Sequence, residues 1–275
     1  MSVRIVSNLP IGNVPKTPLT PFGTYSTPIA DKTLIEHAER LGQPFGYMQE
    51  QNGQLIQNIV PVHKLEFDQI SSSSKAELQM HTETAFHPYM PKYVLLLCLR
   101  DDITAETTYA LLEDILENLD DSVISLLKTD SFCTSIDQSF RTKSECDVLI
   151  RKQIVSNDEQ KLIYDSGLMK PLNKNAGYAL SQMSAAIQKV KRSIVLKTGD
   201  LMIIDNYKTI HGRKPFQAKY DGTDRWLKRC LVLEGLPPKN EYEGRVITTN
   251  IQSFGMSEVD LKHASVAQLD RAEHF

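Results

Sequence analysis

The sequence predicts an α+β protein built around a jelly-roll barrel with flanking helices. Short strand-like segments lie on both sides of a helical cluster, and a long excursion separates the two groups of strands. The 275 residues are 41% hydrophobic and 24% charged, which is ordinary for a globular protein with one sizeable core. Short strands combined with helices fit a barrel of this kind. We therefore expect a single domain over residues 1–275.

The N-terminal part of the chain predicts one helix between irregular and extended segments. Residues 1–30 contain several Pro, Gly, Ser and Thr, which predicts an irregular arm that packs across the domain. Apolar residues at helical spacing predict a helix over 31–41, and Gly42 follows as a stop. The β-rich run 54–62 and the continuous apolar run 92–100 predict strands, the second of them buried on both faces.

The middle of the chain predicts two helices followed by two strands. Helical periodicity predicts helices over 106–119 and 121–127, and an Asp pair suited to capping opens the second one. The segments 132–136 and 147–155 have β-like composition.

The C-terminal part contains the clearest helical pattern. Residues 173–191 have apolar side chains at helical spacing along one face. Three short strands are predicted after this helix, at 193–197, 200–204 and 226–233. The polar tail 265–275 lacks a core pattern, so we expect a disordered or non-native segment there.

Charge and hydropathy exclude several kinds of partner. Lys and Arg total 31 and Asp and Glu total 34, so the net charge of −3 gives no reason to expect nucleic acid or an anionic membrane. The longest apolar run, residues 93–99, is far shorter than the ~20 residues that span a bilayer. The N-terminus has no signal-peptide pattern. We expect a cytoplasmic protein that acts on a small molecule, and the sequence leaves its oligomeric state open.

Two short motifs contain residues that could bind a metal ion. His81 and Glu83 are two residues apart, so an extended chain would point both side chains to the same face. His211 follows a strand-like run and a predicted turn much later in the chain. Two histidines and one carboxylate, with open positions beside them, are the ligand set of non-haem iron(II) oxygenases. The same residue types also bind catalytic zinc, so a zinc hydrolase is an alternative.

Two arginines are candidates for binding carboxylates. Arg225 lies beyond a turn-rich segment after His211, at the start of the predicted strand 226–233. The planar guanidinium group pairs bidentately with a carboxylate, as the distal end of 2-oxoglutarate would require. Strand alternation places Arg229 on the same face as Arg225. A zinc hydrolase would leave these arginines without a role, and a non-catalytic binding barrel is a third hypothesis.

Residues 81–102 and 205–232 together resemble the clavaminate synthase and taurine dioxygenase superfamily. They are most like the branch that contains asparagine oxygenase and the hydroxylases of free arginine and free lysine. The resemblance extends upstream through residues 46–62 and covers most of residues 45–235. Two long blocks in the right order and at the right distance are far more specific than the His-x-Glu motif alone. The resemblance implies a double-stranded β-helix, the barrel form of a jelly roll.

The resemblance also assigns the metal and cosubstrate residues. It implies that His81, Glu83 and His211 bind iron(II), and that Arg225 binds the distal carboxylate of 2-oxoglutarate. Thr108 matches a threonine that helps to bind the same carboxylate, although the adjacent threonine leaves an ambiguity of one residue.

The resemblance further implies three contacts with an amino-acid substrate. Arg229 matches an arginine that binds the α-carboxylate, and Glu50 falls near a position that contacts the amino group or the side chain. Asp165 falls on a lid at about 155–172, where it would reach the polar end of the substrate. The arginine hydroxylase of the branch has a second lid acid two residues earlier, where this chain has Ile163. This departure weakens the case for arginine in particular.

The expected reaction consumes 2-oxoglutarate and dioxygen and hydroxylates an unactivated C3 or C4 carbon. Glu83 favours hydroxylation, because halogenating relatives have a small residue at that position, while desaturation or ring formation stays open. The expected substrate is a free L-amino acid with a basic or amide side chain, with lysine or arginine first and asparagine or glutamine next. The alternatives are a sulfonate, a carrier-bound residue or a peptidyl residue.

Overall fold

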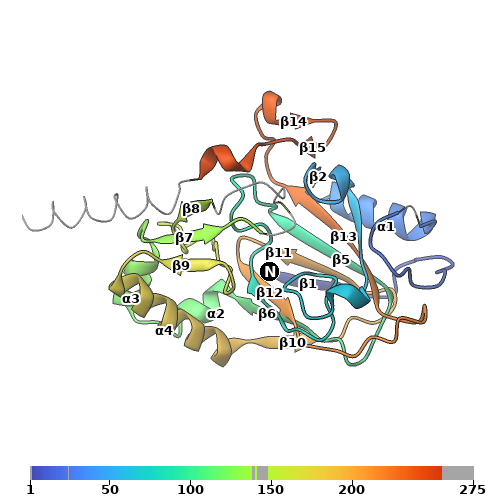
Figure 1. The fold of residues 1–275 in the computed structure, drawn as a ribbon, viewed down its shortest axis with the longest axis horizontal. Helices are drawn as coiled ribbons and strands as arrows, with labels where there is room; N and C mark the ends of the chain where they lie inside the picture. The colour runs from blue at the N-terminus through green and yellow to red at the C-terminus, as the bar shows by residue number, and fades with distance from the viewer. Residues whose placement is uncertain (1, 24, 138–139, 141–147, 256–275) are drawn as a thin grey trace, which may run out of the picture.

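A large β-sheet forms the centre of the fold (Figure 1). The structure, a computed structural model, describes residues 2–23, 25–137, 140 and 148–255 of the chain. The sheet contains, in spatial order, β1 (Val3–Val6), β11 (Leu201–Asp205), β5 (Tyr93–Arg100), β13 (Trp226–Leu233), β2 (Gln43–Tyr47), β15 (Val246–Ile247) and β14 (Tyr242–Glu243). The strand β3 (Ile56–Ile59) also pairs with β13.

Two smaller sheets complete the β-structure of the described residues. One has the order β10 (Arg192–Ile194), β6 (Thr107–Leu111), β12 (Thr209–Arg213) and β4 (Leu78–His81). The other has the order β8 (Leu149–Lys152), β7 (Phe132–Ser135) and β9 (Met169–Pro171). The second sheet carries His81 on β4 and His211 on β12, and the main sheet carries Arg229 on β13, so the strand pairing positions part of the site.

The helices cover the outside of the sheets (Figure 1). The helix α1 (Pro28–Glu39) packs against β2, β5 and β13 of the main sheet. The helices α2 (Leu112–Leu116) and α3 (Asp121–Leu127) pack against α4 (Lys174–Val190), which also contacts β6 and β9. The described residues also include single-turn 3-10 helices at Gln51–Gly53, His63–Leu65, Lys239–Glu241 and Ile251–Phe254. No helix of the described residues is long and apolar enough to cross a membrane.

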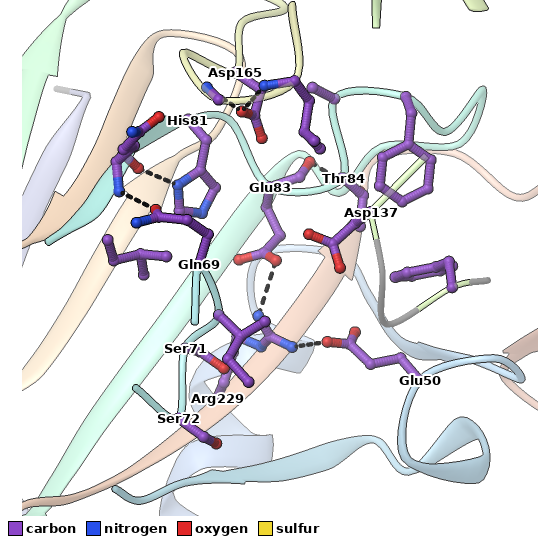
Figure 2. Close-up of a pocket in the computed structure, with 18 of the residues that line it drawn as sticks. Glu50, Gln69, Ser71, Ser72, His81, Glu83, Thr84, Asp137, Asp165 and Arg229 are labelled. Atoms are coloured by element: carbon purple, nitrogen blue, oxygen red, sulfur yellow. Dashed lines mark hydrogen bonds and ion pairs between the residues drawn. The ribbon is translucent and has the colours of Figure 1, made fainter. Parts of the chain in front are cut away.

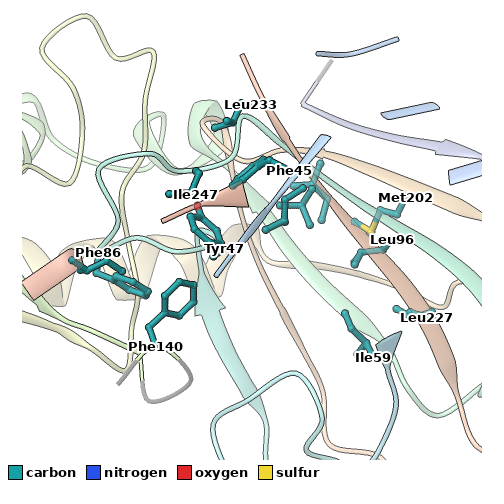
Figure 3. Close-up of a cluster of buried hydrophobic side chains, with 14 of the residues drawn as sticks. Phe45, Tyr47, Ile59, Phe86, Leu96, Phe140, Met202, Leu227, Leu233 and Ile247 are labelled. Carbon is teal, nitrogen blue, oxygen red and sulfur yellow. The ribbon is translucent and has the colours of Figure 1, made fainter. Parts of the chain in front are cut away.

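The strand β5 is buried on both faces, which confirms the prediction from its continuous apolar run. Val94 and Leu96 belong to one hydrophobic cluster, which Tyr109 of β6 contacts and which Figure 3 shows. Leu95 and Leu97 belong to a second cluster, on the side of the sheet that α1 covers. Burial of alternate side chains in two clusters fixes the register of β5 against β11 and β13.

Several segments differ from the prediction, and three of them change the type or the start of an element. Residues 107–111 form β6 instead of part of a helix over 106–119, because they pair with β10 on one side and β12 on the other. This pairing overrides the local helical periodicity. Val3–Val6 forms β1, antiparallel to β11, inside the segment predicted to be an irregular arm. The helix α1 begins at Pro28, earlier than predicted, and the predicted tail 265–275 lies outside the described residues.

Candidate metal centre and adjoining pockets

The structure brings His81, Glu83 and His211 together from two segments of the second sheet. His81 ends β4 and lies directly opposite His211 of β12, with 4.6 Å between the ring centroids. Glu83 lies in the turn that follows β4. One ligand atom of each residue lies within 4.8 Å of the others, and no other such group occurs among the described residues. The donor set and its spacing therefore fit one metal ion.

The protonation states of these residues suit metal binding. Gln79 O lies 2.7 Å from His81 Nδ1, so Nδ1 donates this hydrogen bond and Nε2 is the ring atom left to bind a metal ion. Burial, and then the neighbouring His81, lowers the pKa of His211 below its ordinary value, which favours the neutral ring. Burial alone would raise the pKa of Glu83, but the charge of Arg229 and the nearby ring of His211, 3.7 Å away, hold this pKa far below its usual range. Glu83 is therefore a carboxylate.

Arg229 lies between two carboxylates (Figure 2). Its Nη1 donates to Glu83 Oε1 at 2.8 Å, and its Nη2 forms an ion pair with Glu50. Its Nε donates to Gln57 Oε1 at 2.8 Å, and Gln57 Nε2 donates to Glu50 Oε2 at 3.1 Å. Gln57 is buried on β3 and was not predicted, because its link to Arg229 depends on the pairing of β3 with β13. Arg229, Glu83 and Gln57 are buried and Glu50 is half-buried, and the four side chains form one network beside the metal ligands.

The guanidinium group of Arg225 is buried beside a hydroxyl group. Its Nη2 donates to Thr107 Oγ1 at 3.2 Å, and no acid among the described residues forms an ion pair with it. Burial lowers the pKa of Arg225 to about 10. The resemblance pointed to Thr108, but Thr108 Oγ1 lies against Met80 Sδ at 3.4 Å. Successive residues of β6 point to opposite faces, so the structure places Thr107, and not Thr108, beside Arg225.

A second buried arginine, Arg213, lies near Arg225 and was not predicted. It bonds only neutral oxygens in the described residues, namely Ser73 Oγ at 2.8 Å, Ala76 O at 3.1 Å and Ser74 O at 3.3 Å. Burial, and then the charge of Arg225, lowers its pKa to about 10. Its position two residues after His211 was visible in the sequence, but nothing indicated that its side chain would turn inward.

Two cavities adjoin the candidate metal ligands. The larger, of about 380 Å³, is lined by Glu50, Glu83, Arg229, Asp137 and Asp165, among others (Figure 2). The smaller, of about 50 Å³, is lined by Arg225, Arg213, Thr107 and His211, among others. His81, Glu83 and Arg229 line both cavities. The geometry thus provides one metal centre with a cationic pocket on one side and a pocket of mixed charge on the other.

Asp165 lies opposite His81, in a segment tied to β4. The two residues form an antiparallel bridge, and Thr82 N donates to Tyr164 O at 2.7 Å. Asp165 Oδ1 accepts hydrogen bonds from Gly167 N at 2.8 Å and Leu168 N at 2.9 Å. Burial raises the pKa of Asp165 above its ordinary value. Asp165 lines the larger cavity, and its Oδ1 also holds the turn that follows.

The chain belongs to the family described as taurine catabolism dioxygenase TauD, TfdA, which matches residues 26–231. This match confirms the resemblance that the sequence motifs suggested. The family and the site together define an iron(II)- and 2-oxoglutarate-dependent oxygenase, with an α+β fold made mostly of sheets.

Particular relatives narrow the comparison. The chain is 30% identical over 271 residues to enduracididine beta-hydroxylase of Streptomyces hygroscopicus, covering 87% of this chain and 79% of that protein. It is 35% identical over 205 residues to L-asparagine oxygenase of Streptomyces coelicolor. That match covers 74% of this chain and only 61% of the relative. The structure of asparagine oxygenase with Fe(II), 2S,3S-3-hydroxyasparagine and succinate superposes with a TM-score of 0.84 at 31% identity, over 90% of this chain and 80% of that one.

Proposed function

We propose that this protein hydroxylates an aliphatic carbon of a free L-amino acid with a basic side chain. The supporting observation is the pair of cavities that share His81 and Glu83 as lining residues. The smaller cavity, which His211 also lines, contains unneutralised arginines, and the larger one contains both charges. We assign the three residues to iron(II), and the sheets that hold them to a double-stranded β-helix. A cytoplasmic location stays a prediction.

The smaller cavity fits the distal carboxylate of 2-oxoglutarate. Arg225 and Arg213 are buried cations that have only neutral partners in the described residues. A buried charge without a counter-ion is costly, so an incoming carboxylate would be bound strongly there. Thr107 Oγ1 would contribute to the same carboxylate. Iron(II) with 2-oxoglutarate and dioxygen supplies the oxidising chemistry, which yields succinate, carbon dioxide and a hydroxylated substrate.

The larger cavity fits the α-carboxylate and the α-ammonium group of an amino acid. Arg229 offers a cation for the carboxylate, and Glu50 offers an anion for the ammonium group. In the structure these two side chains neutralise each other and are held by Gln57. A zwitterion can replace this ion pair with two new ones and no change of net charge. Arg229 also holds Glu83, so the same residue places the substrate beside the metal.

The far end of the larger cavity favours a cationic side chain. Asp165 and Asp137 both line it, and the charge of Asp137 contributes to the raised pKa of Asp165. Asp137 is therefore a second acid, from a different segment than the one where Ile163 breaks the family pattern. Two carboxylates match the ammonium of lysine or the guanidinium of arginine better than an amide. We rank the basic amino acids first for this reason.

Changing Asp137 or Asp165 to Asn should selectively weaken binding of the basic amino-acid substrate. Each change removes one charge at the far end of the cavity, so we expect D137N and D165N to raise the KM for the basic substrate by roughly tenfold or more. The KM for 2-oxoglutarate should stay within about twofold of wild type. An equal effect on both substrates would contradict the assignment of these acids to the substrate side chain.

The two adjacent threonines provide a matched pair of variants. Thr107→Val removes the hydroxyl beside Arg225, so the KM for 2-oxoglutarate should rise, by roughly five- to tenfold for one lost hydrogen bond. Thr108→Val removes a hydroxyl that contacts Met80, so that KM should not change. Steady-state succinate formation at varied 2-oxoglutarate distinguishes the two. The opposite order would restore Thr108 as the cosubstrate residue.

A substrate screen tests the proposal directly. The iron-loaded protein is incubated with 2-oxoglutarate and each of the standard amino acids, and succinate and a mass gain of one oxygen atom are measured. We expect coupled turnover with lysine or arginine. Turnover only with a sulfonate, a carrier-bound residue or a peptide would contradict the free-amino-acid substrate and leave the oxygenase class intact.

A further inference from the structure

Asn206 holds the main chain of Glu83 by both of its peptide groups. Asn206 Oδ1 accepts a hydrogen bond from Glu83 N at 2.7 Å, and Asn206 Nδ2 donates to Glu83 O at 3.2 Å. The same Nδ2 donates to Pro91 O at 3.0 Å. Asn206 is fully buried, so water cannot replace these bonds if the amide is removed. The side chain thus acts on Glu83 as a neighbouring strand would.

Glu83 requires such support because it lies outside a strand. β4 ends at His81, and Thr84 adopts a left-handed conformation with φ of 51°. This conformation is strained for a β-branched residue, so it persists only where surrounding contacts impose it. Thr84 Oγ1 donates to Glu83 O at 2.8 Å and lies 3.0 Å from Tyr47 Oη. The peptide groups of Glu83 are therefore fixed from both sides of the turn.

Asn206 also connects the two segments that carry the candidate ligands. It begins the turn between β11 and β12, and β12 carries His211. Its partner Glu83 is 123 residues away in sequence. Asn206 is not among the described residues that line either cavity. Any effect of this residue on metal binding must therefore pass through Glu83 and the turn before His211.

We propose that Asn206 is a positioning residue, which sets the direction of the Glu83 carboxylate toward the metal and Arg229. The inference rests on the proposed metal ligands. Without the amide, the turn would relax toward an unstrained backbone, and the carboxylate would move away from His81 and His211. Residues that hydrogen-bond to a metal ligand without binding the metal typically contribute about 10- to 100-fold to metal affinity.

Co(II) binding to the full-length protein tests this proposal without relying on activity. The dissociation constant and the visible absorption of the Co(II) complex are measured for wild type, Asn206→Ala and Asn206→Asp. We expect both variants to bind Co(II) about 10- to 100-fold more weakly, with an altered absorption spectrum. Asn206→Asp keeps the side-chain volume but replaces the donor with an oxygen that faces two carbonyl groups. It therefore tests positioning even where Asn206→Ala does not fold.

Asn58 provides the matched control for loss of stability. It is also buried, and it accepts a hydrogen bond from Trp226 Nε1 at 3.0 Å. Among the described residues it has no hydrogen bond to a candidate metal ligand, and it lines neither cavity. Asn58→Ala should lower the Tm but leave Co(II) affinity and absorption unchanged. Wild-type Co(II) affinity and absorption in a folded Asn206 variant, or an equal loss in Asn58→Ala, would overturn the role of Asn206. Failure of wild type to bind Co(II) would instead overturn the proposed metal ligands.

Discussion

Replacing His211 by alanine is expected to abolish iron binding and all succinate formation. The two remaining ligands, His81 and Glu83, cannot hold an iron(II) ion in the required geometry. The fold should survive, because Glu83 keeps its ion pair with Arg229 and β12 keeps its main-chain pairing with β4 and β6. Iron content per chain, succinate formation and Tm are measured together.

His37 is a suitable control for this variant. It lies on α1, where its ring bonds the main chain of its own helix at Thr33. His37→Ala should therefore keep wild-type iron content and turnover. Full activity in His211→Ala, or an equal loss of iron in His37→Ala, would refute the assignment of the metal ligands.

Replacing Arg225 by methionine is expected to raise the KM for 2-oxoglutarate by roughly tens- to thousands-fold. The estimate corresponds to roughly 2–5 kcal/mol for loss of one partner of a desolvated charge pair. Methionine keeps much of the buried volume, so packing around Thr107 should be largely preserved. The KM for 2-oxoglutarate and the KM for the amino acid are measured by succinate formation.

Arg229→Met should show the opposite pattern. The KM for the amino acid should rise more than the KM for 2-oxoglutarate, because Arg229 lines the larger cavity together with Glu50. Iron affinity should also fall, since Glu83 and Glu50 would then face each other without the cation between them. If both arginine variants affected only the amino acid, the assignment of the two cavities would be wrong.

The sequence allowed prediction of elements and residues whose signal is local. The apolar run of β5 indicated a strand buried on both faces, and the helical spacing before Lys191 indicated α4. The His-x-Glu motif, the later histidine and the two arginines could be linked because two long blocks resemble one family. These features depend on residue type and spacing, which a sequence displays directly.

Other features depend on pairing between distant segments. The sequence of β6 alone predicts a helix, and only the pairing of this segment with β10 and β12 makes it a strand. Its strand conformation then decides that Thr107 faces Arg225. Gln57, Arg213 and Asn206 carry polar side chains of a kind common on protein surfaces. Their partners come from remote residues, so their burial and their contacts could be seen only in the structure.

The most direct test of the central claim is the coupling between 2-oxoglutarate consumption and amino-acid hydroxylation. Purified protein is supplied with iron(II), 2-oxoglutarate, dioxygen and lysine or arginine, and succinate and hydroxylated amino acid are quantified in the same reaction. We predict equal amounts of the two products, and none of either when iron is removed by a chelator. Turnover that persists with zinc alone, or no succinate with any amino acid, would contradict the assignment.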